Sequence, residues 1–129
     1  MKVSFFSFSE LNRHVVAKIK GRAHNPKYPN LNFVVKDLLK RWETNNESVI
    51  RQAISKRLRG TGRTIVFVGK HTKNSKWVPI EVEMTLAKKK PVYAIWLKDE
   101  SGLPPKCLID NKIYIYKWSE ARLQFLATR

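Results

Sequence analysis

The feature that most constrains the fold is a pair of short segments that are apolar along almost their whole length. Residues 64–68 read Thr-Ile-Val-Phe-Val, and residues 92–97 read Val-Tyr-Ala-Ile-Trp-Leu after a proline. A strand with one face in water alternates apolar and polar residues, whereas a strand covered on both faces is apolar nearly throughout. The two segments therefore predict a parallel sheet buried between two layers of helices.

The first half of the chain alternates strand and helix signals. Residues 2–8 predict an opening strand, and Ser9 is a candidate cap for a first helix that Gly21 ends. A second strand is expected at residues 32–35. The apolar residues that share one face of the first helix are Leu11, Val15, Val16 and Ile19.

A second helix is indicated by the capping-box sequence Thr-x-x-Glu at residues 44–47. Gly60 and Gly62 close it. Its expected buried face consists of Val49, Ile50, Ala53, Ile54 and Leu58.

The second half continues the alternation. A third helix is expected at residues 76–89, where a proline near the start is tolerated because first-turn N–H groups lack helical partners. A loop at 101–106 and a short strand at 113–116 follow. Ser119 caps a last helix that contains Leu123, Phe125 and Leu126. This order predicts an α/β fold with a mostly parallel sheet of four or five strands, in which residues 3–6, 64–68 and 92–97 are central.

Length and composition agree with one domain over residues 1–129. Apolar residues make up 43% of the chain, which is enough for a core. The single cysteine, Cys107, excludes an internal disulfide and suits a reducing cytoplasm. No apolar run approaches the ~20 residues that span a bilayer. The expectation is a cytoplasmic protein without a membrane partner.

The net charge is unusual, because 26 Lys and Arg stand against 10 Asp and Glu, giving +16. A polyanion such as nucleic acid is the partner that this charge favours. The basic residues are spread along the chain and form no single tail. A basic surface that only maintains solubility is the alternative.

The sequence contains no metal-binding pattern. Its three histidines, His14, His24 and His71, lie at no spacing that suits a metal ion. His71 alone falls at a strand end, where it is expected either to line a cleft or to lie in a solvated loop. The glycines at positions 60 and 62 precede a strand, which is the reverse of the order that a phosphate-binding loop needs.

Trp77 and Glu81 are four residues apart at the start of the third predicted helix, so they share one helix face. This face lies next to the crevice that parallel sheets form beyond the carboxyl ends of their strands. Two interpretations stay open. Glu81 is either a catalytic carboxylate, or it complements the helix dipole while Trp77 packs in the core.

The Trp-x-x-x-Glu motif after an apolar strand resembles the motif that carries the catalytic glutamate of NAD-cleaving Toll/interleukin-1 receptor (TIR) domains. Residues 3–8, Val-Ser-Phe-Phe-Ser-Phe, are similar to the family's opening strand with its aromatic-Ser-aromatic end. Residues 49–58, 61–69 and 91–97 are similar to a family helix and two strands. The chain resembles the short TIR-like group of Thoeris anti-phage systems, which implies a flavodoxin-like, three-layer fold.

The resemblance also implies an activity. NAD+ would be a substrate and no cofactor would be needed, with nicotinamide released and an ADP-ribose-derived signal made by hydrolysis or cyclisation. The signal would reach a downstream effector in anti-phage defence, and the protein would form a homo-oligomer. The resemblance assigns catalysis to Glu81. The residues expected to bind substrate are Phe6, Ser7, Phe8, His71 and Trp77.

The chemistry suits one carboxylate. The nicotinamide of NAD+ is already cationic, so it leaves without a general acid. The ribose that remains resembles an oxocarbenium ion, and a nearby carboxylate such as Glu81 can stabilise its charge. Two alternatives from other classes remain, namely a TIR-like interaction module without catalysis and a basic protein that associates with nucleic acid.

Overall fold

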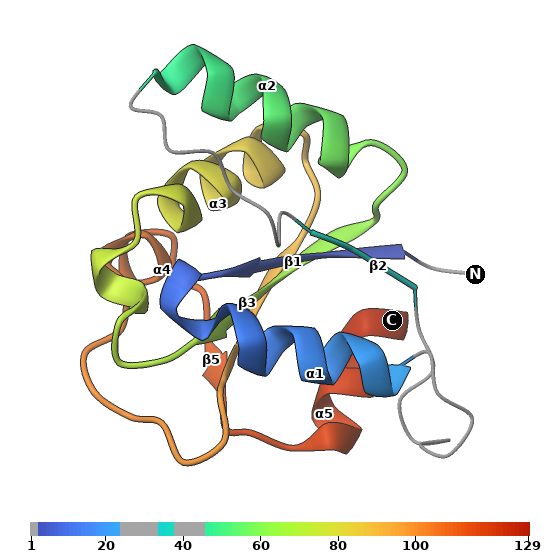
Figure 1. The fold of residues 1–129 in the computed structure, drawn as a ribbon, viewed down its shortest axis with the longest axis vertical. Coiled ribbons are helices and arrows are strands. Elements are labelled where there is room, and N and C mark those ends of the chain that lie inside the picture. Colours follow the sequence, from blue (N-terminus) through green and yellow to red (C-terminus); the bar gives the residue numbers. More distant parts are fainter. Residues whose placement is uncertain (1–2, 24–33, 38–45) are drawn as a thin grey trace.

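The structure is a computed structural model that describes residues 3–23, 34–37 and 46–129 (Figure 1). Its centre is a five-stranded sheet with the order β2-β1-β3-β4-β5, in which all neighbouring strands are parallel. The strands are β1 (Val3–Phe8), β2 (Val34–Asp37), β3 (Arg63–Val68), β4 (Val92–Trp96) and β5 (Ile115–Tyr116). This order is that of flavodoxin-like folds. The expected α/β fold with a parallel sheet is confirmed, and β1, β3 and β4 are its central strands.

Helices cover both faces of the sheet. Figure 1 shows α1 and α5 on one side and α2 and α3 on the other. The helices are η1 (Glu10–Asn12), α1 (Arg13–Ala23), α2 (Glu47–Leu58), η2 (Thr72–Asn74), α3 (Trp77–Ala87), α4 (Lys106–Asp110) and α5 (Glu120–Thr128), where η marks a 3-10 helix. The architecture has three layers, because each face of a buried sheet must lie against apolar side chains.

The central strands are buried on both faces, as their apolar sequences predict. Every residue of β3 is buried. On the α1 and α5 side, Phe6 and Phe67 meet edge to face with ring centroids 4.6 Å apart. On the other side, Val66 and Val68 pack with residues of α3 and α4. The helices on the two faces therefore pack on alternate residues of the same strands.

Two predicted serine caps are confirmed. Ser9 accepts a hydrogen bond from the Leu11 N–H at the start of η1, and Ser119 accepts one from the Arg122 N–H at the start of α5. The cap of α2 differs from the prediction. Asn46 Oδ1 accepts from Ser48 N at 3.0 Å, because an asparagine directly before the first helical residue satisfies the free amides. The Thr44 of the predicted capping box lies outside the described residues.

Some predicted boundaries and faces are wrong. Gly21 lies inside α1, which continues to Ala23, because one glycine costs a helix only ~1 kcal/mol and Ala23 is buried in the core. Leu11 is 63% exposed, since η1 turns it away from the face that buries Val16 and Ile19. The second strand continues to Asp37, beyond the predicted end at residue 35, and its described part begins at Val34. Residues 32 and 33 lie outside the described residues.

The last part of the chain holds a helix that the sequence pattern did not reveal. Residues 101–105 form the expected loop, but α4 follows it directly and buries Leu108. A helix of five residues is too short to produce a periodic pattern, which explains the omission. In α5, Leu123 and Leu126 are buried as expected, whereas Phe125 is exposed.

Candidate active site around Glu81

Glu81 lies one turn after Trp77 in α3, and its side chain is 0% exposed. The Ser7 hydroxyl donates a hydrogen bond to Glu81 Oε1 at 2.7 Å. Ser7 is the penultimate residue of β1, near the carboxyl end of the strand. The strand order reverses between β1 and β3, and such a switch point is where open parallel sheets form their ligand sites.

Side-chain hydroxyl groups fix α3 against the sheet. Thr85 Oγ1 donates to the Glu81 carbonyl at 2.7 Å and lies 2.6 Å from Thr64 Oγ1 of β3. At the start of the helix, Ser75 Oγ accepts from Val78 N at 3.2 Å. Thr64 and Thr85 are fully buried. Hydrogen bonds of side-chain hydroxyls therefore fix α3 at its start and at the Glu81 carbonyl.

The alternation of β1 decides which predicted residues reach Glu81. Ser7 lies on the face of α2 and α3, together with Phe5. Phe6 and Phe8 lie on the opposite face, fully buried in the core beneath α1 and α5. Because neighbouring strand residues point to opposite faces, an aromatic-Ser-aromatic triplet cannot bring all three side chains to one site. The structure brings Ser7 to Glu81 and does not bring Phe6 or Phe8 there.

Trp77 is a core residue in this structure. Its side chain is 8% exposed and belongs to an apolar cluster between α2, α3 and β1. The other buried members of this cluster are Phe5, Ile50, Ile54 and Leu58. Packing in the core is one of the two interpretations of Trp77 that the sequence left open. A contact of Trp77 with substrate stays a prediction.

His71 lies in the turn after β3, directly before η2, and is half-buried. It follows a carboxyl strand end, as expected. Its side chain makes no capping hydrogen bond to η2. The structure does not bring it to Glu81 through any contact among the described residues, so its role also stays a prediction.

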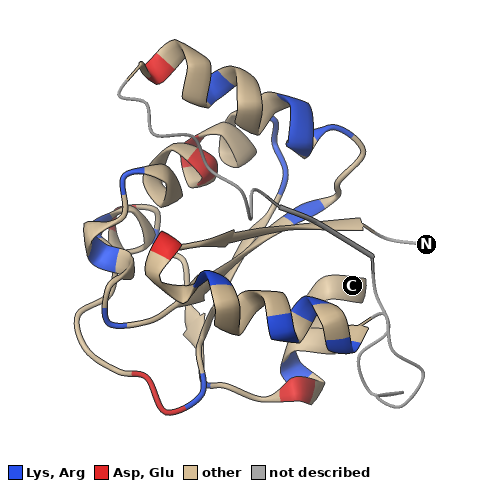
Figure 2. Cartoon of the chain, viewed as in Figure 1, with Lys and Arg blue, Asp and Glu red and all other residues tan. Residues whose placement is uncertain are grey.

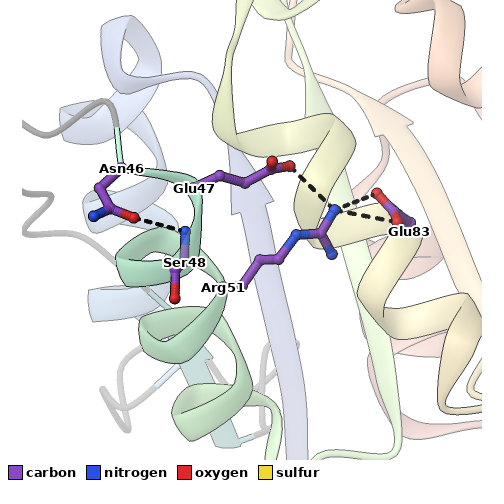
Figure 3. A network of polar contacts seen from close by, with 5 residues as sticks. All are labelled: Asn46, Glu47, Ser48, Arg51 and Glu83. Carbon is purple, nitrogen blue, oxygen red and sulfur yellow. Dashed lines mark hydrogen bonds and ion pairs between the residues drawn. The ribbon is translucent and has the colours of Figure 1, made fainter.

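Glu83 differs sharply from Glu81 although it is only two residues away. Figure 3 shows Arg51 of α2 between two carboxylates, with its Nη2 3.0 Å from Glu83 Oε2 and 3.2 Å from Glu47 Oε1. The hydrogen bond to Glu83, and to a smaller extent the one to Glu47, holds the pKa of Arg51 above its ordinary value. Glu83 is exposed and pairs across the helix interface, which makes it a suitable control for Glu81.

The sequence pattern missed several polar residues of this region. Thr85 follows Glu81 by one turn, and that spacing alone was the signal available for it. Gly69, after β3, lies close to two polar side chains, because a Cβ there would be 2.9 Å from Glu100 Oε1 and 3.0 Å from Asn12 Oδ1. No spacing in the sequence relates Gly69, Asn12 and Glu100, which belong to three separate parts of the chain.

Two absences concern the described residues only. Among residues 3–23, 34–37 and 46–129, no group of three His, Cys, Asp or Glu side chains is arranged to hold a metal ion. Within the same ranges, no helix has the length and apolar character that crossing a membrane requires.

Comparison with known sequences decides the family. Residues 5–101, which are more than half of the chain, match the family described as Thoeris protein ThsB, TIR-like domain. The chain belongs to this family. The resemblance of its motifs to TIR domains is therefore confirmed, and the matched segment of the TIR-like domain includes both Ser7 and Glu81.

Two further comparisons add less. No curated protein matches the chain. Among solved structures, the TIR domains of the activated Roq1 resistosome directly recognizing the pathogen effector XopQ are similar, with 13% identity and a TM-score of 0.46. That similarity covers 98% of this chain and 69% of the other.

Proposed function

We propose that this TIR-like domain cleaves NAD+ between nicotinamide and ribose, with the Glu81 carboxylate next to the reacting ribose. The product would be an ADP-ribose-derived signal in anti-phage defence. Membership of the Thoeris ThsB family supports the general role. The observation that carries the proposal is the 2.7 Å hydrogen bond from Ser7 to a fully buried Glu81.

The buried carboxylate suits the chemistry. When the C1′–N bond breaks, its electron pair leaves with nicotinamide and positive charge develops on the ribose. A fixed carboxylate in a site without water stabilises that charge more strongly than an exposed one, because the local dielectric constant is low. Water, or a hydroxyl of the same molecule in cyclisation, then adds to C1′ and loses a proton.

Ser7 has a positioning role in this proposal. A buried carboxylate is costly unless it accepts hydrogen bonds, and the Ser7 hydroxyl supplies one. The same bond fixes the orientation of Glu81 Oε1 before substrate binds. Stabilisation of this kind requires little reorganisation during the reaction.

The complete burial of Glu81 has a consequence for regulation. Since no part of its side chain is exposed, NAD+ reaches the carboxylate only after the surrounding chain rearranges. The resting protein should therefore be a poor enzyme, and infection or assembly should increase its activity. The low resting activity and its increase on infection are both measurable in cells that express the protein.

The test compares wild type, Glu81→Gln and Glu83→Gln. Cellular NAD+ and released nicotinamide are measured before and during phage infection, and the Tm of each purified protein is measured. Glu81→Gln should lower cleavage at least about a hundredfold, which is roughly 3 kcal/mol, because it removes the charge while nearly preserving shape. Glu83→Gln should retain activity, because Glu83 pairs with Arg51 at the surface. Equal cleavage by all three folded proteins would refute the proposal.

A second candidate is an interaction module without catalysis. The same burial favours it, because a fully enclosed carboxylate bound to Ser7 is also what a purely structural glutamate looks like. In that case Glu81→Gln would keep protection against phage, and cellular NAD+ would stay constant during infection. The experiment above separates the two functions.

A further inference from the structure

A surface formed by β5 and α5 combines exposed aromatic rings with basic side chains. We define this β5–α5 surface by Tyr114, Tyr116, Lys117, Arg122, Phe125 and Arg129. Tyr114 is 70% exposed and Phe125 is 49% exposed. Large aromatic side chains are normally placed in the core, so two of them in water on neighbouring elements indicate a binding surface.

The rings and the guanidinium groups are stacked on one another. Arg122 Cζ lies 4.7 Å from the centroid of the Tyr116 ring and 5.8 Å from that of Phe125. Arg129 Cζ lies 5.2 Å from the Phe125 centroid. The rings of Tyr114 and Tyr116 meet edge to face at 4.8 Å. These cation–π contacts keep the guanidinium groups next to the aromatic rings at the surface.

The charge of this surface has one sign. A depression of about 520 Å³ lies between the rings, and the described residues that line it include Lys117 and Arg122 but no Asp or Glu. Glu120, the acidic residue of α5, lies 4.0 Å from Arg22 of α1. Lys and Arg also occur on the helices of both faces (Figure 2), which adds a positive field around the whole molecule.

We propose that the β5–α5 surface binds single-stranded nucleic acid. Phosphates would contact Lys117, Arg122 and Arg129, while unpaired bases stack on Tyr114 and Phe125. Proteins that bind single strands combine these same two features, a positive groove and aromatic platforms. In a duplex the faces of the bases are stacked on one another, so its phosphates can bind but its bases cannot stack on the aromatic rings of the protein. This function goes beyond NAD+ cleavage, and its residues lie outside the segment 5–101 that matches the family.

A second copy of the chain is the competing occupant. An exposed apolar patch often mediates self-association. Charge argues against it here, because each copy carries a net charge of +16 and none of the described residues that line the depression is acidic. A polyanion has a charge complementary to this surface, whereas a second positively charged copy is repelled by it.

The experiment measures binding of fluorescent 12-nucleotide dT and rU strands, and of a 12-base-pair DNA duplex, by anisotropy at several salt concentrations. The wild type should bind both single strands more tightly than the duplex. Tyr114→Ala and Phe125→Ala should each weaken single-strand binding at least about fivefold and leave the salt slope unchanged, because they remove stacking alone. Arg122→Ala should reduce the slope by about 0.7, the value for one phosphate contact.

Arg57→Ala is the matched control, since Arg57 is exposed on α2 without any ring contact among the described residues. It should weaken binding less than Arg122→Ala. The proposal is refuted if the ring variants bind single strands as tightly as the wild type, if duplex binds equally well, or if no single strand binds in 50 mM salt. A concentration-dependent dimer in sedimentation that Phe125→Ala abolishes would also overturn it, because the surface would then belong to a second copy.

Discussion

The Ser7 hydroxyl donates to Glu81 Oε1 at 2.7 Å across a sequence separation of 74 residues. Both side chains are fully buried, and they connect the end of β1 to the second turn of α3. This bond joins two motifs that the sequence presented separately, the aromatic-Ser-aromatic strand end and Trp-x-x-x-Glu. In the proposed function Ser7 positions the carboxylate, and direct contact of Ser7 with substrate stays a prediction.

The Ser7→Ala variant tests that assignment. Loss of the hydroxyl leaves the buried Glu81 with one donor fewer, so we expect the free energy of unfolding to fall by about 1–3 kcal/mol. Cleavage of NAD+ under infection should fall about tenfold or more, because the orientation of the carboxylate is less fixed. Urea unfolding and nicotinamide release measure the two effects.

Ser4→Ala is the matched control for this variant. Ser4 is also fully buried in β1, but its hydroxyl donates to the Ala127 carbonyl at 3.2 Å on the other face of the sheet. Arg63 Nη1 also donates to that carbonyl at 3.2 Å, so the acceptor stays satisfied. Ser4→Ala should keep wild-type activity. A similar loss of activity in both serine variants would indicate a general effect of the strand rather than of the Ser7 bond.

The Thr64–Thr85 pair allows a double-mutant test. Thr85→Val keeps the shape but leaves the buried Thr64 hydroxyl without the contact at 2.6 Å, so unfolding free energy should fall by about 1–3 kcal/mol. The double variant Thr64→Val, Thr85→Val should regain most of this loss, because no hydroxyl is left unsatisfied. Chemical denaturation of all four proteins gives the coupling energy. Strictly additive losses would show that the two hydroxyls do not interact.

The ion pairs of Arg51 should contribute little to stability. Arg51 joins α2 to Glu83 of α3, but these side chains are exposed and the pairing is screened by salt (Figure 3). We expect Arg51→Met to change Tm slightly at low salt and even less in 0.5 M NaCl. A large decrease in Tm that persists at high salt would mean that Arg51 supports packing between the helices.

Cys107 should be inert. Burial raises the pKa of its thiol, so at neutral pH less thiolate is present than in a free cysteine. Iodoacetamide should therefore modify Cys107 more slowly than a cysteine in a short peptide at pH 7.5, and the rate should increase as the pH rises toward the raised pKa. Cys107→Ser should fold and keep its activity. Fast labelling at pH 7.5 would contradict this prediction.

Local sequence patterns predicted most of the elements correctly. The apolar runs that became β3 and β4 were predicted without tertiary information, because a strand covered on both faces is apolar nearly throughout. Ser9 and Ser119 were recognisable as caps because capping involves neighbouring residues. The predicted end of α1 at Gly21 was wrong. The helix continues because Ala23 is buried in the core, and that burial depends on residues far from Gly21 in the sequence.

The sequence by itself determined the parallel α/β fold, its three central strands and the choice of Glu81 as the candidate carboxylate. Only the tertiary structure decided which residues face Glu81. The pleat of β1 directs Ser7 toward α3 and Phe6 and Phe8 toward α1 and α5, and Trp77 packs with α2. Periodicity assigns a residue to a face, but strand order and helix packing determine what that face meets. Those depend on contacts between residues far apart in the chain.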